Sequence, residues 1–263
     1  LKANLMASIV AQERKISING LDINCKIIGE GKPLLVLHGW GSGSEKWQEV
    51  GKIIAEKGFK IIIPNLPGFG KSQNLPNPWC INDYCGFLQS LVESLEMDKF
   101  CLLGHSFGGA ISSKYAVLHP QKIEKLFLVG ASCLRKKTFR KIFLTKFAKF
   151  FNFLSFLPFY ALLRKGFYKY IVQKSDYLNT QGVLRETFLN IINEDLSDKL
   201  LLVTVPTVII WGDKDDIIPL KNGLEINKRI KGSKMVIIKG GDHHLEQRMP
   251  EILSQKILEN LSD

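Results

Sequence analysis

The sequence contains no long apolar run, no closely paired cysteines and no export signal. No stretch approaches the roughly 18 uninterrupted apolar residues of a membrane-spanning helix. The amino-terminal residues lack the charged-then-apolar order of a signal peptide, which argues against secretion. The cysteines form no C-x-x-C pattern, so we predict free thiols in a cytoplasmic protein without a metal site or a cofactor. They are Cys25, Cys80, Cys85, Cys101 and Cys133.

Acidic residues are missing from one segment that is rich in positive charge. Between Ala131 and Ser175 the chain has eleven basic residues and no acidic one, and these alone account for the formal charge of +11. The same segment holds twelve of the 26 aromatic residues, so its composition differs from that of its surroundings. Since 263 residues with 45% hydrophobic content suffice for one large core, we interpret the segment as an insertion into a single α/β domain.

Short β-branched runs alternate with helical segments along the rest of the chain. This alternation is typical of a mainly parallel sheet with helices on both faces. From Leu34 onward the runs are almost continuously apolar, as strands buried on both faces must be. Asn19-Gly20 joins the first two runs and predicts a hairpin. Strands are expected over 15–18, 23–28, 34–37, 60–63, 100–103, 125–129, 207–211 and 234–238, and helices over 82–95 and 107–118.

The motif Gly104-His105-Ser106-Phe107-Gly108 lies between an expected strand and an expected helix. The bare pattern G-x-S-x-G would occur by chance in on the order of one chain in ten of this size. On a strand-to-helix turn, however, it projects the serine hydroxyl clear of the backbone, and the N-terminus of the helix favours a developing negative charge. We therefore predict Ser106 as a nucleophile. The alternative is an ordinary glycine-rich helix entry.

A second glycine-containing loop, His38-Gly39-Trp40-Gly41, follows another buried strand. Its glycines permit a turn that aims backbone N–H groups at one point. Beside the serine turn, the N–H groups of Trp40 and Phe107 would form a two-donor oxyanion hole, in which each donor typically contributes about 3 kcal/mol to transition-state stabilisation. His38 is predicted to form structural hydrogen bonds beneath the loop.

A serine hydroxyl needs a general base, and the base needs an acceptor that orients it. The strand at 207–211 ends in a loop with three candidate acids, Asp213, Asp215 and Asp216. The next strand is followed by His243 and His244. The order Ser, Asp, His, each after a strand, fits the carboxyl edge where α/β sheets place their sites. The pattern alone leaves open which acid and which histidine act.

Together these motifs resemble the α/β-hydrolase superfamily, over nearly all of the chain from about 23 to 261. The family pattern W-G-x-x-D-x-x-x-P is similar to residues 211–219, which implies Asp215 as the acid. The family histidine stands seven residues before a proline, which implies His243, seven before Pro250. The family turn D-x-P-G-x-G-x-S is similar to 65–72, with Asn65 in place of the usual aspartate. A serine at 106 disfavours haloalkane dehalogenases and epoxide hydrolases, whose nucleophile is an aspartate.

The H-G-W-G loop, with Trp47 farther on, is similar to that of capped esterases and of hydrolases that act on meta-cleavage products of aromatic degradation. The resemblance implies a mostly parallel eight-stranded sheet, helices on both faces and a helical cap inserted after the sixth strand. We accordingly expect a core formed by 1–133 and 200–263 and a cap formed by 134–199.

Within the expected cap, Phe139, Phe143 and Phe147 recur at helical spacing, which predicts one aromatic helix face. We expect this face to pack onto the substrate pocket, so the three residues are pocket candidates. In the other interpretation, the basic, aromatic cap contacts an anionic membrane or guides an anionic acyl substrate. Nucleic-acid binding is disfavoured because the basic residues are interleaved with Phe and Leu at core-like density.

We expect a hydrolase of carboxylic esters with small to medium acyl groups, acting through an acyl-enzyme on Ser106. C–C bond hydrolysis of meta-cleavage products and lactone hydrolysis use the same three residues and stay open, because no short motif encodes the pocket. The contrasting class is a non-catalytic ligand receptor or membrane-docking protein that keeps the fold. The motifs do not encode the natural substrate or the oligomeric state.

Overall fold

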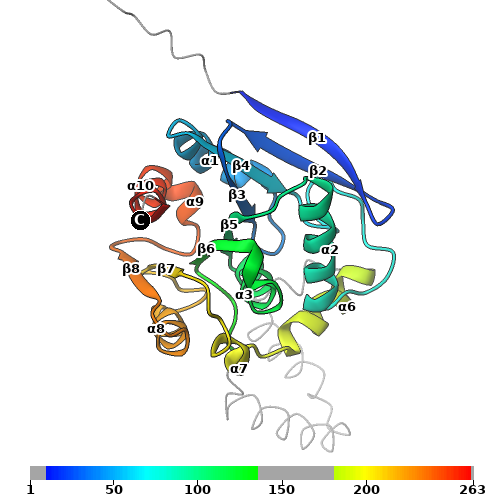
Figure 1. Ribbon diagram of the computed structural model, residues 1–263. Coiled ribbons are helices and arrows are strands. Elements are labelled where there is room, and N and C mark those ends of the chain that lie inside the picture. Colours follow the sequence, from blue (N-terminus) through cyan, green and yellow to red (C-terminus); the bar gives the residue numbers. More distant parts are fainter. Residues whose placement is uncertain (1–9, 136–180, 262–263) are drawn as a thin grey trace, which may run out of the picture.

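The computed structural model describes residues 10–135 and 181–261 (Figure 1). Its centre is a single eight-stranded sheet in the order β1-β2-β4-β3-β5-β6-β7-β8. The strands are β1 (Ala11–Ile18), β2 (Leu21–Ile28), β3 (Lys32–Leu37), β4 (Phe59–Pro64), β5 (Phe100–His105), β6 (Ile123–Val129), β7 (Thr207–Gly212) and β8 (Lys234–Ile238). Each of them contains or overlaps one of the strands predicted from the sequence, so the predicted fold class is confirmed.

Only the first two ladders of the sheet are antiparallel. β1 pairs with β2 and β2 pairs with β4 in antiparallel register, whereas all pairs from β4 to β8 are parallel. The turn between β1 and β2 is the predicted hairpin, in which both Asn19 and Gly20 have positive φ, at 51° and 79°. Positive φ at both central residues matches the right-handed twist of the flanking strands.

Helices cover both faces of the sheet (Figure 1). On one side lie α1 (Gln48–Ala55), which follows the short 3-10 helix η1 (Ser44–Trp47), together with α9 (Leu245–Arg248) and α10 (Pro250–Leu261). On the other side lie α2 (Ile81–Ser94), α3 (Phe107–Leu118), α6 (Gly182–Asn193), α7 (Ser197–Leu200) and α8 (Leu220–Arg229). A further 3-10 turn, η2 (Pro120–Lys122), leads into β6. Both helices predicted from the sequence, α2 and α3, are confirmed.

Alternate side chains of the central strands pack into two separate hydrophobic cores, one on each face of the sheet. In β3, Leu35 packs with the core on the α2 and α3 side, while Leu34 packs with the core on the α1 and α10 side. In β5, Leu102 and Leu103 divide in the same way, and all of these side chains are at most 1% exposed. Because both faces of each strand are buried, the strands read as continuous apolar runs instead of alternating ones.

The strand order reverses at β3, which positions the functional site. From β3 the chain crosses to β4 on one side, and after β4 it crosses back through α2 to β5 on the other side of β3. The carboxyl ends of β3 and β5 therefore lie next to each other and open a crevice where α/β folds bind ligands. The His38 loop follows β3, and Ser106 follows β5.

The described residues on the two sides of the expected cap, 133–135 and 195–196, lie next to each other. The Leu196 N–H donates to the Cys133 carbonyl (3.0 Å), and the Arg135 N–H donates to the Asp195 carboxylate (3.1 Å). Most of the expected cap, including the three pocket candidates Phe139, Phe143 and Phe147 and the basic residues from 136 onward, lies outside the described residues. The proposed domain boundaries remain a prediction.

All five cysteines are described, and each is a free thiol, four of them buried. Burial raises the pKa of the Cys25 and Cys85 thiols to about 12, so these are unreactive core groups. In the described ranges no helix is long and apolar enough to cross a bilayer. The same ranges contain no group of three or more His, Cys, Asp or Glu side chains arranged to hold a metal ion.

Candidate active site

Ser106 occupies a strained turn between β5 and α3. Its φ and ψ are 52° and −112°, a conformation that L-residues other than glycine rarely adopt. Two backbone hydrogen bonds fix the turn: the Ser106 N–H donates to the Val129 carbonyl (3.0 Å), and the Ser132 N–H donates to the Ser106 carbonyl (2.9 Å). Strain that is held in this way is typical of functional residues. The structure thus gives Ser106 the geometry that the motif predicts.

The two motif glycines allow this turn to pack. A Cβ atom at Gly104 would collide with the Gly108 carbonyl and the Ser112 hydroxyl. A Cβ atom at Gly108 would collide with the Leu37 and His38 carbonyls at the end of β3. The glycines are therefore required by close backbone approach, which is a physical reason for the G-x-S-x-G spacing.

The His38 loop lies against the serine turn. A Cβ atom at Gly39 would lie only 3.3 Å from the Cβ atom of Ser106, and the rings of Trp40 and Phe107 are 5.4 Å apart. Neither the Trp40 N–H nor the Phe107 N–H donates to another group in the part of the chain that the structure describes. Both amides are thus close to Ser106 and available as donors.

His38 anchors this loop from below, as predicted. It is fully buried, and its Nδ1 donates to the Gly39 carbonyl (2.8 Å), while its Nε2 accepts from the Leu66 N–H (2.9 Å). One ring nitrogen must therefore carry a proton and the other must not. Burial lowers the pKa of His38 to about 4, so the imidazole is neutral at physiological pH.

Asp215 and His243 are joined by a buried hydrogen bond. His243 Nδ1 lies 2.8 Å from Asp215 Oδ2, and the two side chains are 5% and 1% exposed. The other carboxylate oxygen accepts from the backbone N–H groups of Ile217 (3.0 Å) and Ile218 (2.7 Å). The carboxylate is therefore held in one orientation, and it keeps the Nδ1–H tautomer of His243, which leaves Nε2 as a base.

The neighbouring acids and histidine have other positions. Asp213 Oδ1 accepts from the Gly240 N–H (2.6 Å) and so stabilises the loop. The side chain of Asp216 is exposed. The side chain of His244 is 44% exposed, and its Nδ1 lies 3.9 Å from Glu246 and not beside Asp215. Of the candidates that the sequence left open, Asp215 and His243 form the pair.

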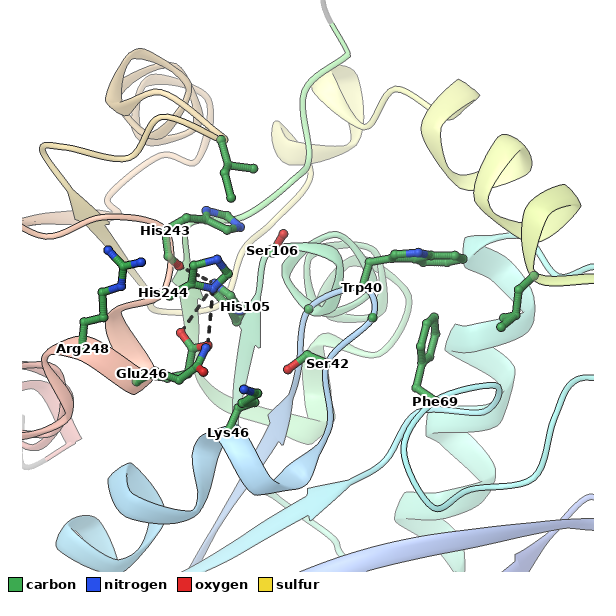
Figure 2. Close-up of a pocket in the computed structure, with 15 residues that line it drawn as sticks. Trp40, Ser42, Lys46, Phe69, His105, Ser106, His243, His244, Glu246 and Arg248 are labelled. Atoms are coloured by element: carbon green, nitrogen blue, oxygen red, sulfur yellow. Dashed lines mark hydrogen bonds and ion pairs between the residues drawn. The ribbon is translucent and has the colours of Figure 1, made fainter. Parts of the chain in front are cut away.

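Ser106 and His243 line one cavity of about 830 Å³ (Figure 2). The ring of His105, the residue before Ser106, lies 4.9 Å from the ring of His243. No hydrogen bond joins Ser106 to His243 in this structure. Such bonds are often long in the absence of substrate and tighten when substrate binds. Within the described residues, Ser106, His243 and Trp40 thus border one common cavity.

One wall of the cavity is aromatic. The Trp40 ring packs against the rings of Phe69 (4.8 Å) and Phe188 of α6 (5.1 Å). Leu184 of α6 also lines the cavity, and α6 is fixed to the core because the Trp79 N–H donates to the Thr187 hydroxyl (3.0 Å). This wall was not predicted from the sequence. Phe69 lies inside the 65–72 turn and could have been found from that motif, whereas no pattern singled out α6.

The opposite side of the cavity is polar. It includes Ser42, Lys46, Gln247 and Arg248, and in Figure 2 Arg248 and His244 lie on the other side of Ser106 from Trp40 and Phe69. The Arg248 guanidinium pairs with the Asp242 carboxylate. The cavity thus joins an apolar wall to a hydrogen-bonding one, with Ser106 between them.

Asn65 keeps a structural role although the related turn usually has an aspartate there. Its Oδ1 accepts from the Ser44 N–H (2.6 Å), and its Nδ2 donates to Asn24 Oδ1 (3.2 Å). An amide can donate and accept at once, which a carboxylate cannot. The amide therefore ties β2 to η1 beneath the site.

Comparisons with known proteins bear on the family of the fold. A family model described as the alpha/beta hydrolase fold matches residues 32–245. A 2-hydroxy-6-oxononadienedioate/2-hydroxy-6-oxononatrienedioate hydrolase from Klebsiella pneumoniae is 26% identical over 264 residues, covering 92% of this chain and 91% of the relative. A hydrolase of the same name from Escherichia coli is equally similar, at 26% over 264 residues.

Solved structures show the same fold. An esterase from Exiguobacterium antarcticum superposes with a TM-score of 0.75 at 21% identity, over 96% of this chain and 100% of the esterase. A meta-cleavage product hydrolase from Pseudomonas fluorescens gives a TM-score of 0.71 at 17% identity, over 97% of this chain and 99% of that one. Because the family model covers most of its length, the chain belongs to the α/β-hydrolase fold family. It is a hydrolase.

Proposed function

We propose that the chain is a serine hydrolase that cleaves carboxylic esters, with Ser106 as nucleophile, His243 as general base and Asp215 as the residue that orients the base. The single observation that carries the proposal is the buried hydrogen bond between His243 Nδ1 and Asp215 Oδ2 (2.8 Å) beside the strained Ser106 turn. In acyl transfer the serine hydroxyl needs a base to become nucleophilic, and the histidine–carboxylate pair is such a base.

In the proposed mechanism, the Ser106 Oγ attacks the substrate carbonyl carbon while His243 Nε2 takes the hydroxyl proton. The negative charge that develops on the carbonyl oxygen is held by the Trp40 and Phe107 N–H groups, and loss of one such donor would cost about 3 kcal/mol of transition-state stabilisation. Asp215 stabilises the imidazolium without itself taking the proton. Collapse of the intermediate expels the alcohol, which receives the proton from His243.

Water then releases the acyl group from Ser106. His243 takes a proton from the water, the hydroxide adds to the acyl carbon, and collapse returns the proton to Ser106. The cavity of about 830 Å³ and its aromatic wall fit a small to medium acyl group packed against Trp40, Phe69 and Leu184. Apolar contacts along the acyl chain and a few polar groups near the carbonyl are the usual division of labour in such pockets.

Turnover of p-nitrophenyl acetate, butyrate and octanoate by the purified full chain tests the proposal. We expect hydrolysis of the shorter esters by the unmodified chain and a loss of at least about 10³-fold in kcat for Ser106→Ala. Ser94→Ala, at an exposed position on α2 away from the cavity, serves as the matched control and should retain full activity. Equal turnover by Ser106→Ala and the unmodified chain would reject Ser106 as nucleophile.

A second candidate function is hydrolysis of a C–C bond in a meta-cleavage product. It is favoured by the 26% identity, over 92% of this chain, to a hydrolase whose name specifies such substrates. The same serine, histidine and oxyanion donors would serve, but the leaving group is a carbon whose electron pair is delocalised into the conjugated dienoate and takes up the proton, in place of an alcohol. Comparing kcat/KM for a p-nitrophenyl ester with that for a 2-hydroxy-6-oxo-dienoate separates the two. A ratio above one supports the esterase proposal, and a ratio well below one replaces it with the C–C hydrolase.

A further inference from the structure

Glu246 is a buried carboxylate that the proposed mechanism does not use. It lies in α9, three residues after His243, and is 2% exposed. Its Oε1 accepts from Gln247 Nε2 (3.0 Å), whereas its Oε2 is fully buried and has no hydrogen-bond partner among the described residues. Burying a carboxylate with an unpaired oxygen costs several kcal/mol. A group kept at that cost calls for a physical explanation.

The imidazole of His105 lies close to this oxygen. Glu246 Oε2 lies 4.0 Å from His105 Nε2, and the His105 side chain is 4% exposed. The same Nε2 lies 2.9 Å from the backbone carbonyl oxygen of His243. A carbonyl can only accept, so Nε2 carries the proton and Nδ1 does not. The carboxylate thus faces an N–H that already supports the loop of His243.

His105 joins the two halves of the site. It precedes Ser106 in the chain, it holds the backbone of His243, and its ring lies 4.9 Å from the ring of His243. Trp47 packs against the same imidazole, with 5.7 Å between the ring centres. Any shift of His105 would therefore move the nucleophile turn and the loop of the base together.

We propose that Glu246 and His105 are a positioning pair: His105 fixes the backbone of His243, and the negative charge of Glu246 favours the protonated imidazole of His243 that forms during catalysis. This inference rests on the proposed function of His243 as general base. Both residues border the cavity of Ser106, but Glu246 Oε2 and His105 Nδ1 are fully buried, so the pair acts through His243 and not through these two atoms on the substrate.

The charge of Glu246 acts together with the other groups around His243. Asp215 on the β7–α8 loop pairs with it directly, His105 of β5 and the neighbouring His244 contact its ring, and Arg248 is neutralised by Asp242. Glu246 reaches this group through His105, 4.0 Å away, and through His244, 3.9 Å away, and the exposed Lys46 of η1 lines the same cavity. Because Glu246 is 2% exposed, its charge is screened less than that of Lys46. A nearby negative charge favours the cationic form of a histidine.

Replacing Glu246 with Gln, which keeps the shape and removes the charge, tests the proposal. We expect kcat to fall about fivefold to tenfold with KM almost unchanged, and the acid limb of the kcat/KM–pH profile to move about 0.5–1 pH unit toward lower pH. Glu246→Asp, which keeps the charge, should retain the midpoint of the acid limb. Glu251→Gln on α10 removes the same charge from an exposed position and is the matched control.

A readout without turnover separates this inference from the proposed function. In histidine-labelled full-length protein, the His243 ring signal, assigned through His243→Gln, is followed by NMR from pH 4 to 9. We expect its titration midpoint to fall in Glu246→Gln and to stay in Glu251→Gln, while melting temperatures show that both variants fold. An unchanged midpoint in folded Glu246→Gln overturns the role of Glu246, whatever the ester assays give. Absence of turnover with a shifted midpoint rejects the proposed function alone.

Discussion

Acid lability should arise in large part from two buried histidines beneath the active site. His38 and His105 are 0% and 3% exposed, and burial lowers the pKa of each to about 4. In the unfolded chain each would titrate near 6.5. Between these two values the unfolded state binds more protons than the folded state, so the free energy of unfolding falls as the pH falls from about 6.5 to about 4.

The size of the effect follows from the same numbers. The interval between 6.5 and about 4 corresponds to roughly 3 kcal/mol for each histidine, or about 1.4 kcal/mol per pH unit within it. Natural domains unfold with only about 5–15 kcal/mol in total. The two histidines can thus remove a large share of the stability before the carboxylates titrate, and this part of the stability is fully present above pH 6.5.

Urea unfolding of the chain and of His38→Gln, followed by tryptophan fluorescence from pH 7 to pH 4.5, measures the contribution of His38. Glutamine can donate to the Gly39 carbonyl and accept from the Leu66 N–H but does not titrate. We expect the variant to be less stable at pH 7 and the difference to shrink by about 2–3 kcal/mol toward pH 4.5. Parallel curves across the whole range would refute the assignment of a neutral, buried His38.

Two further predictions concern the machinery of the site. Asp215→Asn should fold normally but lose about 10⁴-fold in kcat on p-nitrophenyl acetate, because the amide would no longer select the Nδ1–H tautomer of His243; retention of more than a tenth of the activity would contradict the role of Asp215. Gly104→Ala should lower the melting temperature by roughly 5–10 °C, since its Cβ would collide with Gly108 and Ser112. An unchanged melting temperature would contradict the steric need for glycine at position 104.

The sheet could be predicted from sequence because its strands are buried on both faces. Runs such as 34–37 and 208–211 have no polar interruption, and the reversal of strand order at β3 puts the residues that follow β3 and β5 side by side. The pairing of Asp215 with His243 was implied by family resemblance, because spacing alone did not distinguish the neighbouring acids. The hydrogen bond between His243 and Asp215 is seen only in the folded structure.

Other parts of the site depend on contacts that no local pattern carries. Leu184 lines the cavity, and Phe188 packs on Trp40, because α6 docks through Thr187 onto Trp79, more than a hundred residues away in the chain. Glu246 belongs to a polar stretch of sequence that predicts an exposed position, yet its side chain is buried next to His105 in the folded chain. Burial of this kind follows from tertiary packing and not from periodicity, so it could not be predicted.

Covalent labelling of the full chain with a fluorophosphonate, followed by peptide mass spectrometry, tests the central claim most directly. We expect one adduct, on the peptide that carries Ser106, absent in Ser106→Ala and formed at least about 100-fold more slowly in His243→Ala. A chain that stays unlabelled, an adduct on another residue, or equal labelling rates with and without His243 would contradict it.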